Sequence, residues 1–395
     1  MVRNDGSSDF ICNILKEYWG LEMLIAVWLF LIILGFYFKK NKSIVLVQMI
    51  FASILIACNV NNPDYGNGVD FIGITNDFLL IFKDNIIYNL LFYIFGKFST
   101  YDIAVFFISV LSYSLIYKFI IKYTKKVAFV FSFYLISPFV IDATQFKNFV
   151  AMSVWIYSMQ FLIDAYSANK SKQKKLIVLY CIGCLIATGI HYSFLICFLY
   201  VLVIPLKKRG TFDLIKIGIF ILAFKILIDN FLENLVVLLS KTGIELFNLL
   251  QFKLYAYSIN YNAEAAKARV LVTLMCYAII GLFFVYFKLS KKKNYSVESI
   301  EKTYASFSVR IVLLSAVCIP LISNSMEMYR VQRNILLILY VLIALVTGNN
   351  AISKGRLKIK SFTFFLLGLG IAMCYLLFDS IIWNFDTVFR SLFRI

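Results

Sequence analysis

The sequence predicts an all-α polytopic integral membrane protein with about twelve transmembrane helices. Of its 395 residues, 62% are hydrophobic and only 15% are charged. Soluble domains average about 45–50% apolar and about 25% charged residues. The apolar residues gather in runs of about 17–21 residues, close to the roughly 20 that a helix needs to cross a bilayer. No separate soluble domain interrupts these runs, so we expect a single transmembrane domain over residues 1–395.

The expected spans follow the apolar runs in chain order. They cover residues 19–38, 44–60, 101–117, 127–143, 147–166, 176–190, 192–206, 212–229, 269–287, 307–323, 333–348 and 361–379. Residues 176–206 form one apolar run that is long for a single span. A tight turn is expected near its middle, at Gly189-Ile190-His191-Tyr192, which divides the run into two helices.

Two further apolar segments are not expected to span. Residues 77–96 are interrupted by Asp, Lys and Asn, so we expect an interfacial or re-entrant helix within an outer connection over residues 61–100. Residues 230–268 form a long outer loop with its own apolar stretch, and we expect it to cover the outer surface as a lid.

Basic connections alternate with poorly basic ones along the chain. The basic connections lie at residues 39–42, 118–126, 169–175, 207–209, 288–293 and 354–360, and they hold more than half of the 39 lysines and arginines. Lysine and arginine are retained on the cytoplasmic side of a membrane. The pattern therefore places both termini on the outer, periplasmic side. It also explains the net charge of +18 by topology and attraction to anionic lipid rather than by binding of nucleic acid.

The first outer connection contains Asp64, Tyr65 and Asp70 among Asn, Pro and Gly residues. Pro, Gly and Asn account for a turn without any function. Carboxylates near the mouth of a cavity can also bind sugar hydroxyls or act as a general base. Both interpretations stay open.

A second group of polar residues, Asp142 to Asn148, lies at an outer helix junction. A helix beginning near Lys147 would turn the positive end of its dipole toward this surface. Together with Lys147 it could hold an anion such as phosphate. Alternatively, Lys147 extends to the lipid head groups without any other role.

His191 is the only histidine, and it lies where two apolar helices meet at the outer face. Ionisable groups at membrane depth are costly and are functional candidates, and histidine titrates near neutral pH. A hydrogen-bonded structural histidine is the alternative.

Arg330 and Arg333 are three residues apart on a predicted helix face, on the side that the charge rule leaves poor in arginine. Bidentate binding of a diphosphate would account for them; a local ion pair of Glu327 with Arg330 is the alternative.

Several kinds of site are missing from the sequence. It has no Walker A loop, no paired-glycine nucleotide fingerprint and no Gly-x-Ser-x-Gly elbow. One histidine and no Cys/His cluster argue against a metal site. An enzyme built on this chain is therefore expected to need no cofactor and to take a pre-activated substrate from the membrane.

These motifs resemble the EpsG/Wzy-type polymerases of bacterial surface polysaccharides such as O-antigen, capsule and exopolysaccharide. The resemblance rests on Asn-Pro-Asp-Tyr at residues 62–65, QFKNFVAMSV at 145–154, ATGIHYSFLI at 187–196, Leu-Tyr-Ala-Tyr at 254–257 and MEMYRVQRN at 326–334. It covers roughly residues 55–347, and its most specific part is residues 145–195.

The resemblance implies a membrane glycosyltransferase of the GT-C-like kind in the bacterial plasma membrane. Such an enzyme moves a growing glycan from undecaprenyl diphosphate to a hydroxyl of another lipid-linked repeat unit on the outer face. The lipid diphosphate is the leaving group, so neither ATP nor a sugar nucleotide is required. The implied partners are the undecaprenyl-diphosphate-linked oligosaccharide, the lipid bilayer and a chain-length regulator protein, with no nucleic acid.

The resemblance and the residue chemistry together assign three roles. The expected catalytic residues are His191, Asp64 and Asp70; the expected diphosphate-binding residues are Arg330, Arg333 and Lys147; and the expected glycan-binding residues are Tyr65, Gln145 and Tyr329. Lys147 stands where relatives usually carry arginine. Lysine keeps the charge but lacks the bidentate fork of a guanidinium, which shifts the diphosphate role toward the two arginines.

Two other functions fit an apolar chain of this kind. One is a transporter or flippase of lipid-linked oligosaccharides, and the other is a different membrane glycosyl- or acyltransferase. Carriers often show internal repeats and charged residues near the bilayer midplane. Here the candidate residues gather on one face and no repeat is visible, which favours the enzyme.

Overall fold

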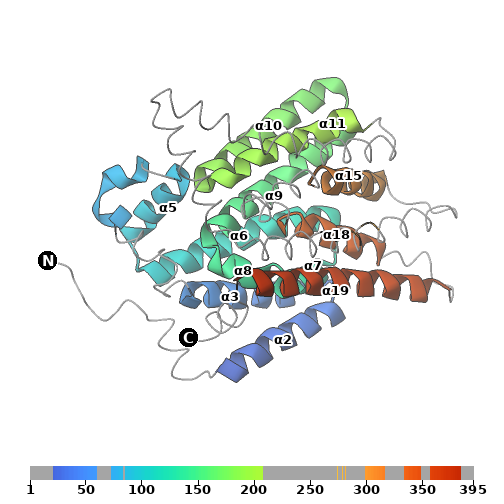
Figure 1. The fold of residues 1–395 in the computed structure, drawn as a ribbon, viewed down its shortest axis with the longest axis horizontal. Helices are drawn as coiled ribbons and strands as arrows, with labels where there is room; N and C mark the ends of the chain where they lie inside the picture. Colours follow the sequence, from blue (N-terminus) through green and yellow to red (C-terminus); the bar gives the residue numbers. More distant parts are fainter. Residues whose placement is uncertain are drawn as a thin grey trace.

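Every element in the described part of the chain is a helix (Figure 1). The computed structural model describes residues 21–59, 73–82, 85–207, 299–315, 333–347 and 356–383, together with Leu274, Ala278 and Gly281. In chain order the elements are α2 (Leu21–Tyr37), α3 (Lys42–Asn59), η2 (Phe78–Phe82), α5 (Ile86–Gly96), α6 (Tyr101–Tyr123), α7 (Val127–Ile136), α8 (Phe139–Thr144), α9 (Phe146–Ser167), α10 (Lys170–Ile190), η3 (Tyr192–Leu202), α11 (Val203–Leu206), α15 (Ser299–Ser315), α18 (Leu336–Val346) and α19 (Arg356–Trp383). The predicted all-α class is confirmed for these residues.

Three described helices are long and apolar enough to cross a membrane, namely α6, α9 and α10. At about 1.5 Å of rise per residue each is roughly 30–35 Å long, which matches the hydrocarbon core of a bilayer. The other apolar stretches found within the described helices have 10–17 residues, such as Phe362–Leu377 within α19. The predicted total of about twelve spans stays a prediction, since residues 212–229 and 269–287 lie almost entirely outside the described part of the chain.

The centre of the bundle is formed by α7 and α18. Every side chain of α7 is buried, and so is every side chain of α18 except Val346. A helix that is apolar on all sides is stable only when other elements surround it. Here α7 packs against α2, α3, α18 and α19. The residues that begin α18 are therefore held inside the bundle and not at its periphery.

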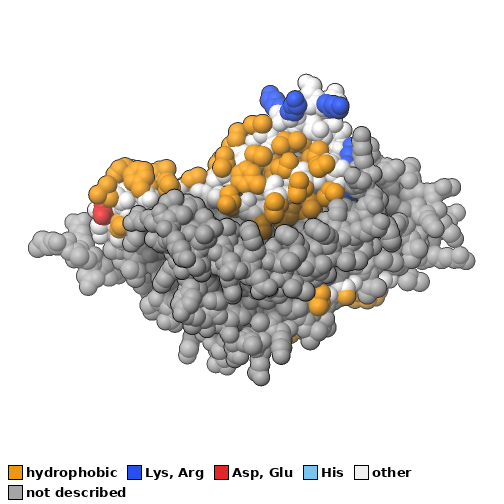
Figure 2. All heavy atoms as spheres, turned by 45° about the horizontal axis from the view of Figure 1, so that its top comes forward, with side chains coloured by type: hydrophobic (Ala, Val, Ile, Leu, Met, Phe, Trp, Pro, Cys, Tyr) orange, Lys and Arg blue, Asp and Glu red, His pale blue; other side chains and the backbone are white. Residues whose placement is uncertain are grey.

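The outer surface of α10 and η3 is apolar. Val178, Ile182, Leu185 and Ile186 follow one another at helical spacing and are exposed. Figure 2 shows a continuous apolar surface over this part of the molecule, with Lys and Arg side chains gathered at its edge. Large exposed apolar patches mark a surface that meets a protein or a membrane. This patch is what lipid contact requires, and the lysines at the start of α10 mark where the apolar surface ends.

The helices approach closely where one of them carries glycine. A side chain added at Gly183 of α10 would overlap Ser158 of α9. One added at Gly189 would come within 2.7 Å of Ile87 in α5. Small residues let apolar helices gain van der Waals contact in a membrane, where the hydrophobic effect does not drive association. The end of α10 that leads to His191 is thus held between α9 and α5.

The predicted single span over residues 127–143 is broken in the structure. Helix α7 ends at Ile136 and α8 begins at Phe139, with Ser137 and Pro138 between them. Proline has no N–H for the helix ladder, and its ring disfavours the helical conformation of the residue before it. The prediction of one continuous helix is wrong, because the length of an apolar segment does not reveal a helix break inside it.

The predicted break near His191 is confirmed. Helix α10 ends at Ile190, His191 is extended with φ −150° and ψ 117°, and η3 begins at Tyr192. The apolar run of residues 176–206 therefore breaks at His191, within the predicted turn Gly189-Ile190-His191-Tyr192.

The described residues between 77 and 96 form two short pieces, η2 and α5. Asn85, directly before α5, lies in the left-handed region at φ 49°. Helix α5 has 11 residues and is roughly 16 Å long, too short to cross a bilayer. Its predicted location at the outer interface stays a prediction, as does the outer connection over residues 61–100. The expected outer loop over residues 230–268 lies outside the described residues.

Basic connections meet at one end of the bundle. The Nζ atom of Lys126 donates to the carbonyl oxygen of Ala344 in the last turn of α18, at 3.2 Å. Lys207 donates to the carbonyl oxygen of Tyr166 at the end of α9, at 2.6 Å. Lys39 lies 5.4 Å from the ring centroid of Phe129 at the start of α7. The connections at residues 39–42, 118–126 and 207–209 thus share one end, as the lysine pattern predicts; the side of the membrane that this end faces stays a prediction.

Candidate functional site

The candidate site lies toward the opposite helix ends, where α8 meets α9 and where α18 begins. Pro138 precedes the six residues of α8, and Gln145 then leaves the helical conformation before α9 starts at Phe146. This short break brings Asp142, Gln145 and Asn148 into neighbouring turns. A helix does begin next to Lys147, as the sequence predicts. Arg333 and Asn334 come from a distant part of the chain, directly before α18.

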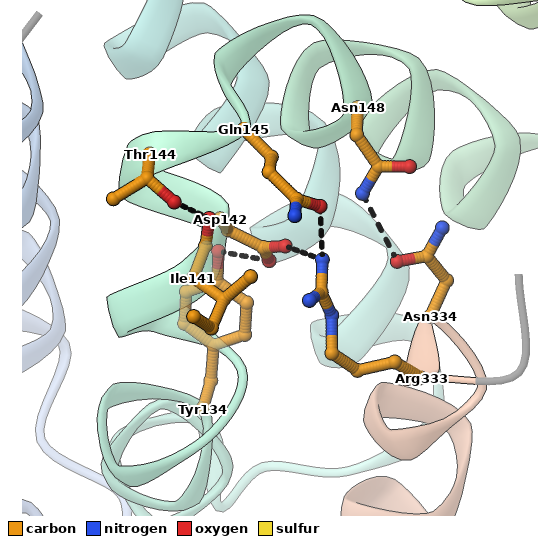
Figure 3. Close-up of polar contacts among 8 residues, drawn as sticks. All are labelled: Tyr134, Ile141, Asp142, Thr144, Gln145, Asn148, Arg333 and Asn334. Atoms are coloured by element: carbon orange, nitrogen blue, oxygen red, sulfur yellow. Dashed lines mark hydrogen bonds and ion pairs between the residues drawn. The ribbon is translucent and has the colours of Figure 1, made fainter. Parts of the chain in front are cut away.

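An ion pair joins the two segments. The Nη2 atom of Arg333 lies 3.1 Å from Oδ1 of Asp142, and both side chains are fully buried. The same nitrogen donates to Oε1 of Gln145 at 3.0 Å. On the far side of the carboxylate, the hydroxyl of Tyr134 donates to Oδ2 of Asp142 at 3.0 Å. Figure 3 shows the guanidinium between the Asp142 and Gln145 side chains.

This arrangement removes the net charge of the cluster. An isolated buried guanidinium would carry a large desolvation cost, which a hydrogen-bonded carboxylate offsets. Charged residues within membrane proteins generally pair in this way and face the bundle interior. The Asp142 carboxylate neutralises the guanidinium, which makes Arg333 a weaker partner for a diphosphate anion than an uncompensated cation would be. In the structure, Arg333 connects the segment before α18 to the junction of α8 and α9; its predicted contact with a diphosphate stays a prediction.

A second, uncharged link lies beside the ion pair. The side-chain amide of Asn148 donates to Oδ1 of Asn334 at 3.4 Å, and each of the two side chains is 1% exposed. Asn148 is one turn along α9 from Gln145, and Asn334 follows Arg333 (Figure 3). The same two segments are therefore joined twice, once through charges and once through amides.

Lys147 projects from the first turn of α9 toward α5. Its Nζ atom lies 5.1 Å from the ring centroid of Tyr88, and the adjacent Phe146 packs on the same tyrosine ring. A cation over an aromatic face is stabilised by the ring quadrupole. Lys147 is only partly buried. It is thus a cation at the border of the buried cluster, whereas Arg333 lies within it.

His191 has a well-defined hydrogen-bonding environment. Its side chain is 8% exposed. The backbone N–H of Ser193 donates to Nδ1 at 3.3 Å, and the Ser193 hydroxyl lies 2.7 Å from the same atom. Because Nδ1 accepts a hydrogen bond, the proton of the neutral ring is on Nε2. The ring also stacks on Tyr192 at a centroid distance of 5.2 Å. The capping contact at Nδ1 orients the ring.

The predicted site residues divide into three groups. Gln145 and Arg333 are brought together directly. Lys147 contacts α5 at Tyr88, and α10 contacts α5 at Gly189, close to His191, so α5 lies between these two candidates. The remaining predicted residues lie outside the described part of the chain: Asp64, Tyr65, Asp70, Tyr329 and Arg330. Their predicted roles stay predictions.

Asp142, Asn148 and Asn334 received no role from the sequence, although they complete the cluster. A signal for Asp142 was available, because a carboxylate at the end of an apolar run needs a cationic partner. Arg333, a cation entering another apolar run, is the matching charge. The two asparagines carry no such signal, since an amide in a loop beside a helix is ordinary. Within the described ranges, no group of three or more His, Cys, Asp or Glu side chains could hold a metal ion.

Comparison with known proteins places the chain in a family. The sequence model of the EpsG family matches residues 62–387, which include both halves of the buried cluster and His191. No curated protein and no solved structure matches the chain. The match covers most of the 395 residues and includes all five motifs on which the resemblance rests. The chain therefore belongs to the EpsG family.

Proposed function

We propose that the protein polymerises lipid-linked oligosaccharide repeat units into a bacterial surface polysaccharide. The observation that carries this proposal is the match of the EpsG family over residues 62–387. A helical bundle with an apolar outer surface and a buried polar cluster supports it, because a lipid-linked substrate would arrive from the membrane itself. In this proposal the growing glycan passes from undecaprenyl diphosphate to a hydroxyl of another lipid-linked unit.

The proposed reaction is a glycosyl transfer. The bond between the anomeric carbon of the donor sugar and the diphosphate oxygen breaks, and the lipid diphosphate leaves with that electron pair. A bond forms between the same carbon and the acceptor hydroxyl oxygen, and the hydroxyl proton passes to a base. The diphosphate is a good leaving group, so the donor sugar is already activated and no nucleotide is consumed. The protein must therefore position two chains, stabilise the negative charge that develops on the diphosphate and accept one proton.

For the diphosphate we propose Arg330 and Lys147. Lys147 is a partly exposed cation at the start of a helix, where anions are favoured. Arg333, the third predicted cation, is engaged by Asp142 and Gln145. We therefore propose that Arg333 positions the segment that leads from Arg330 into α18. This assignment places a guanidinium and an ammonium, and not two guanidiniums, at the leaving group.

As the catalytic residues we propose His191, Asp64 and Asp70. In the neutral ring Nδ1 accepts from Ser193 and Nε2 carries the proton. In that state His191 donates a hydrogen bond through Nε2, so it would hold the acceptor or the leaving group, and one of the carboxylates would serve as the base. Gln145, Tyr65 and Tyr329 are proposed to contact the glycan.

The decisive experiment is to analyse lipid-linked and surface glycans in a strain that lacks this protein. We expect single repeat units on the outer face and no polymer, with normal polymer after the gene is restored. Loss of all repeat units from the outer face would instead identify a flippase. Normal polymer with a missing acyl group would identify an acyltransferase. Either result would overturn the polymerase proposal.

A further inference from the structure

Asn148 and Asn334 each engage only one of their two side-chain polar groups in the bond between them. Their mutual bond engages the amino group of Asn148 and the carbonyl oxygen of Asn334. The carbonyl oxygen of Asn148 and the amino group of Asn334 have no hydrogen-bond partner among the described residues, although both atoms are buried. A buried polar atom without a partner costs about 1–3 kcal/mol. Such atoms in a native fold call for an explanation, and a bound ligand or water supplies one.

The two remaining atoms form a donor–acceptor pair. Figure 3 shows the Asn148 carbonyl oxygen and the Asn334 amino group on the side of the amide pair that is turned away from Arg333. The 3.4 Å bond between the two amides keeps them adjacent. If both amides turned over, their mutual bond would persist and one donor and one acceptor would still point outward. The pattern is thus the same in both of the joint orientations that keep the mutual bond.

The charge of the surroundings limits the ligand. The guanidinium of Arg333 and the carboxylate of Asp142 neutralise each other at 3.1 Å. The Nε2 atom of Gln145, a further donor, also has no partner among the described residues. A diphosphate has acceptors only and would need a net positive site. A sugar hydroxyl is both donor and acceptor, so neighbouring hydroxyls of a neutral sugar ring complement the amide pair.

We propose that Asn148 and Asn334 form a hydroxyl-binding subsite for an uncharged sugar residue of the glycan, with Asp142 and Arg333 as positioning residues. This inference rests on the proposed function and adds that glycan and diphosphate are held by separate groups. Because both asparagines are buried, the sugar enters with a local opening where α18 begins. Asn334 and Ile335 form a turn there, between Arg333 and the regular helix.

The test compares binding of two probes to the purified full-length protein in lipid nanodiscs. One probe is the oligosaccharide released by mild acid from the lipid carrier of the deletion strain, and the other is inorganic diphosphate. Asn148→Leu and Asn334→Leu each remove one outward atom at similar volume. We expect each variant to weaken oligosaccharide binding by about two- to tenfold, as the loss of one hydrogen bond implies. Diphosphate binding should not change.

Gln48→Leu is the matched control. Gln48 is also a fully buried amide, but its amino group donates to Leu31 and Ser132 in a different part of the bundle. We expect the folded Gln48→Leu variant to bind both probes with unchanged affinity. If a leucine variant at position 148 or 334 does not accumulate, the corresponding serine variant replaces it. Serine is too short to reach the same hydroxyl and should weaken oligosaccharide binding similarly.

Two results would overturn the inference. Unchanged oligosaccharide affinity in both asparagine variants would mean that the amides bind only each other and water. A parallel loss of diphosphate affinity would mean that the cluster serves the leaving group. With polymer absent from the deletion strain, either result leaves the polymerase proposal intact. Normal polymer in that strain, by contrast, would overturn the proposed function and this inference together.

Discussion

Arg333 and Asp142 meet at 3.1 Å with no part of either side chain exposed, although 191 residues separate them in the chain. This contact holds the beginning of the central helix α18 next to the junction of α8 and α9. At its other end, α18 is bound by Lys126, which donates to the carbonyl oxygen of Ala344. A buried cation thus contacts each end of the helix. The position of α18 is determined by these two polar contacts as well as by its apolar surface.

Substitutions at Asp142 and Arg333 should have strongly coupled effects on the free energy of unfolding. Asp142→Asn or Arg333→Met alone leaves one buried charge without its partner, which costs about 3–5 kcal/mol. The double variant Asp142→Asn/Arg333→Met removes both charges and should lose less than the sum of the two. Thermal denaturation of the detergent-solubilised protein measures all three. Additive losses would show that the two side chains do not interact as the structure has them.

Arg330 and Arg333 should respond differently to alanine. We expect Arg330→Ala to abolish polymer while the protein accumulates in the membrane at its usual amount. Arg333→Ala should also abolish polymer, but with a lower amount of protein, because Asp142 is then left buried without its partner. Immunoblots of membranes, read beside polymer length on gels, separate the two effects. Normal polymer from Arg330→Ala would remove it from the diphosphate site.

His191→Asn separates capping from chemistry. The shorter side chain retains an acceptor for the Ser193 N–H but lacks any atom at the position of Nε2. We expect the variant to fold normally and to polymerise at least about a hundredfold more slowly, the range for loss of a hydrogen-bond donor at the reacting groups. Polymer formation from isolated membranes measures the rate. A wild-type rate would make His191 a capping residue only.

The contact between α9 and α10 should not tolerate a larger side chain at Gly183. A side chain there overlaps Ser158, and overpacking of a close contact costs about 1–3 kcal/mol. We expect Gly183→Leu to lower the denaturation temperature clearly. Gly370→Leu is the control, because a Cβ atom at Gly370 in α19 meets nothing within 4 Å. Equal losses from the two variants would contradict the close approach of α9 and α10.

The orientation in the membrane can be tested with two cysteine substitutions. Phe98→Cys lies between α5 and α6, where the native side chain is 88% exposed. Ser171→Cys lies in the lysine-rich start of α10 and is also exposed. If the basic end is cytoplasmic, a membrane-impermeant thiol reagent should label position 98 in intact cells and position 171 only after lysis. The unsubstituted protein reports the background from its own cysteines. Labelling of position 171 in intact cells would invert the predicted topology.

Much of the fold could be predicted because it rests on local properties. The apolar length of residues 101–117 and 147–166 predicts membrane-crossing helices, and α6 and α9 cover those residues. The turn at His191 was predictable from an apolar run too long for one helix. The break between α7 and α8 was missed, because one Ser-Pro step ended the helix without changing the apolar pattern.

The sequence by itself determined that this chain is a helical membrane protein of the EpsG family, and it predicted the shared end of the basic connections that the structure shows for Lys39, Lys126 and Lys207. Those properties follow from hydropathy, charge and motif along the chain. Only the tertiary structure decided that Arg333 is neutralised by Asp142, and that Asn148 and Asn334 pair beside it. The reason is physical: the cost of burying a charge or an amide depends on what surrounds it, and here the surrounding groups come from segments 186 to 191 residues apart.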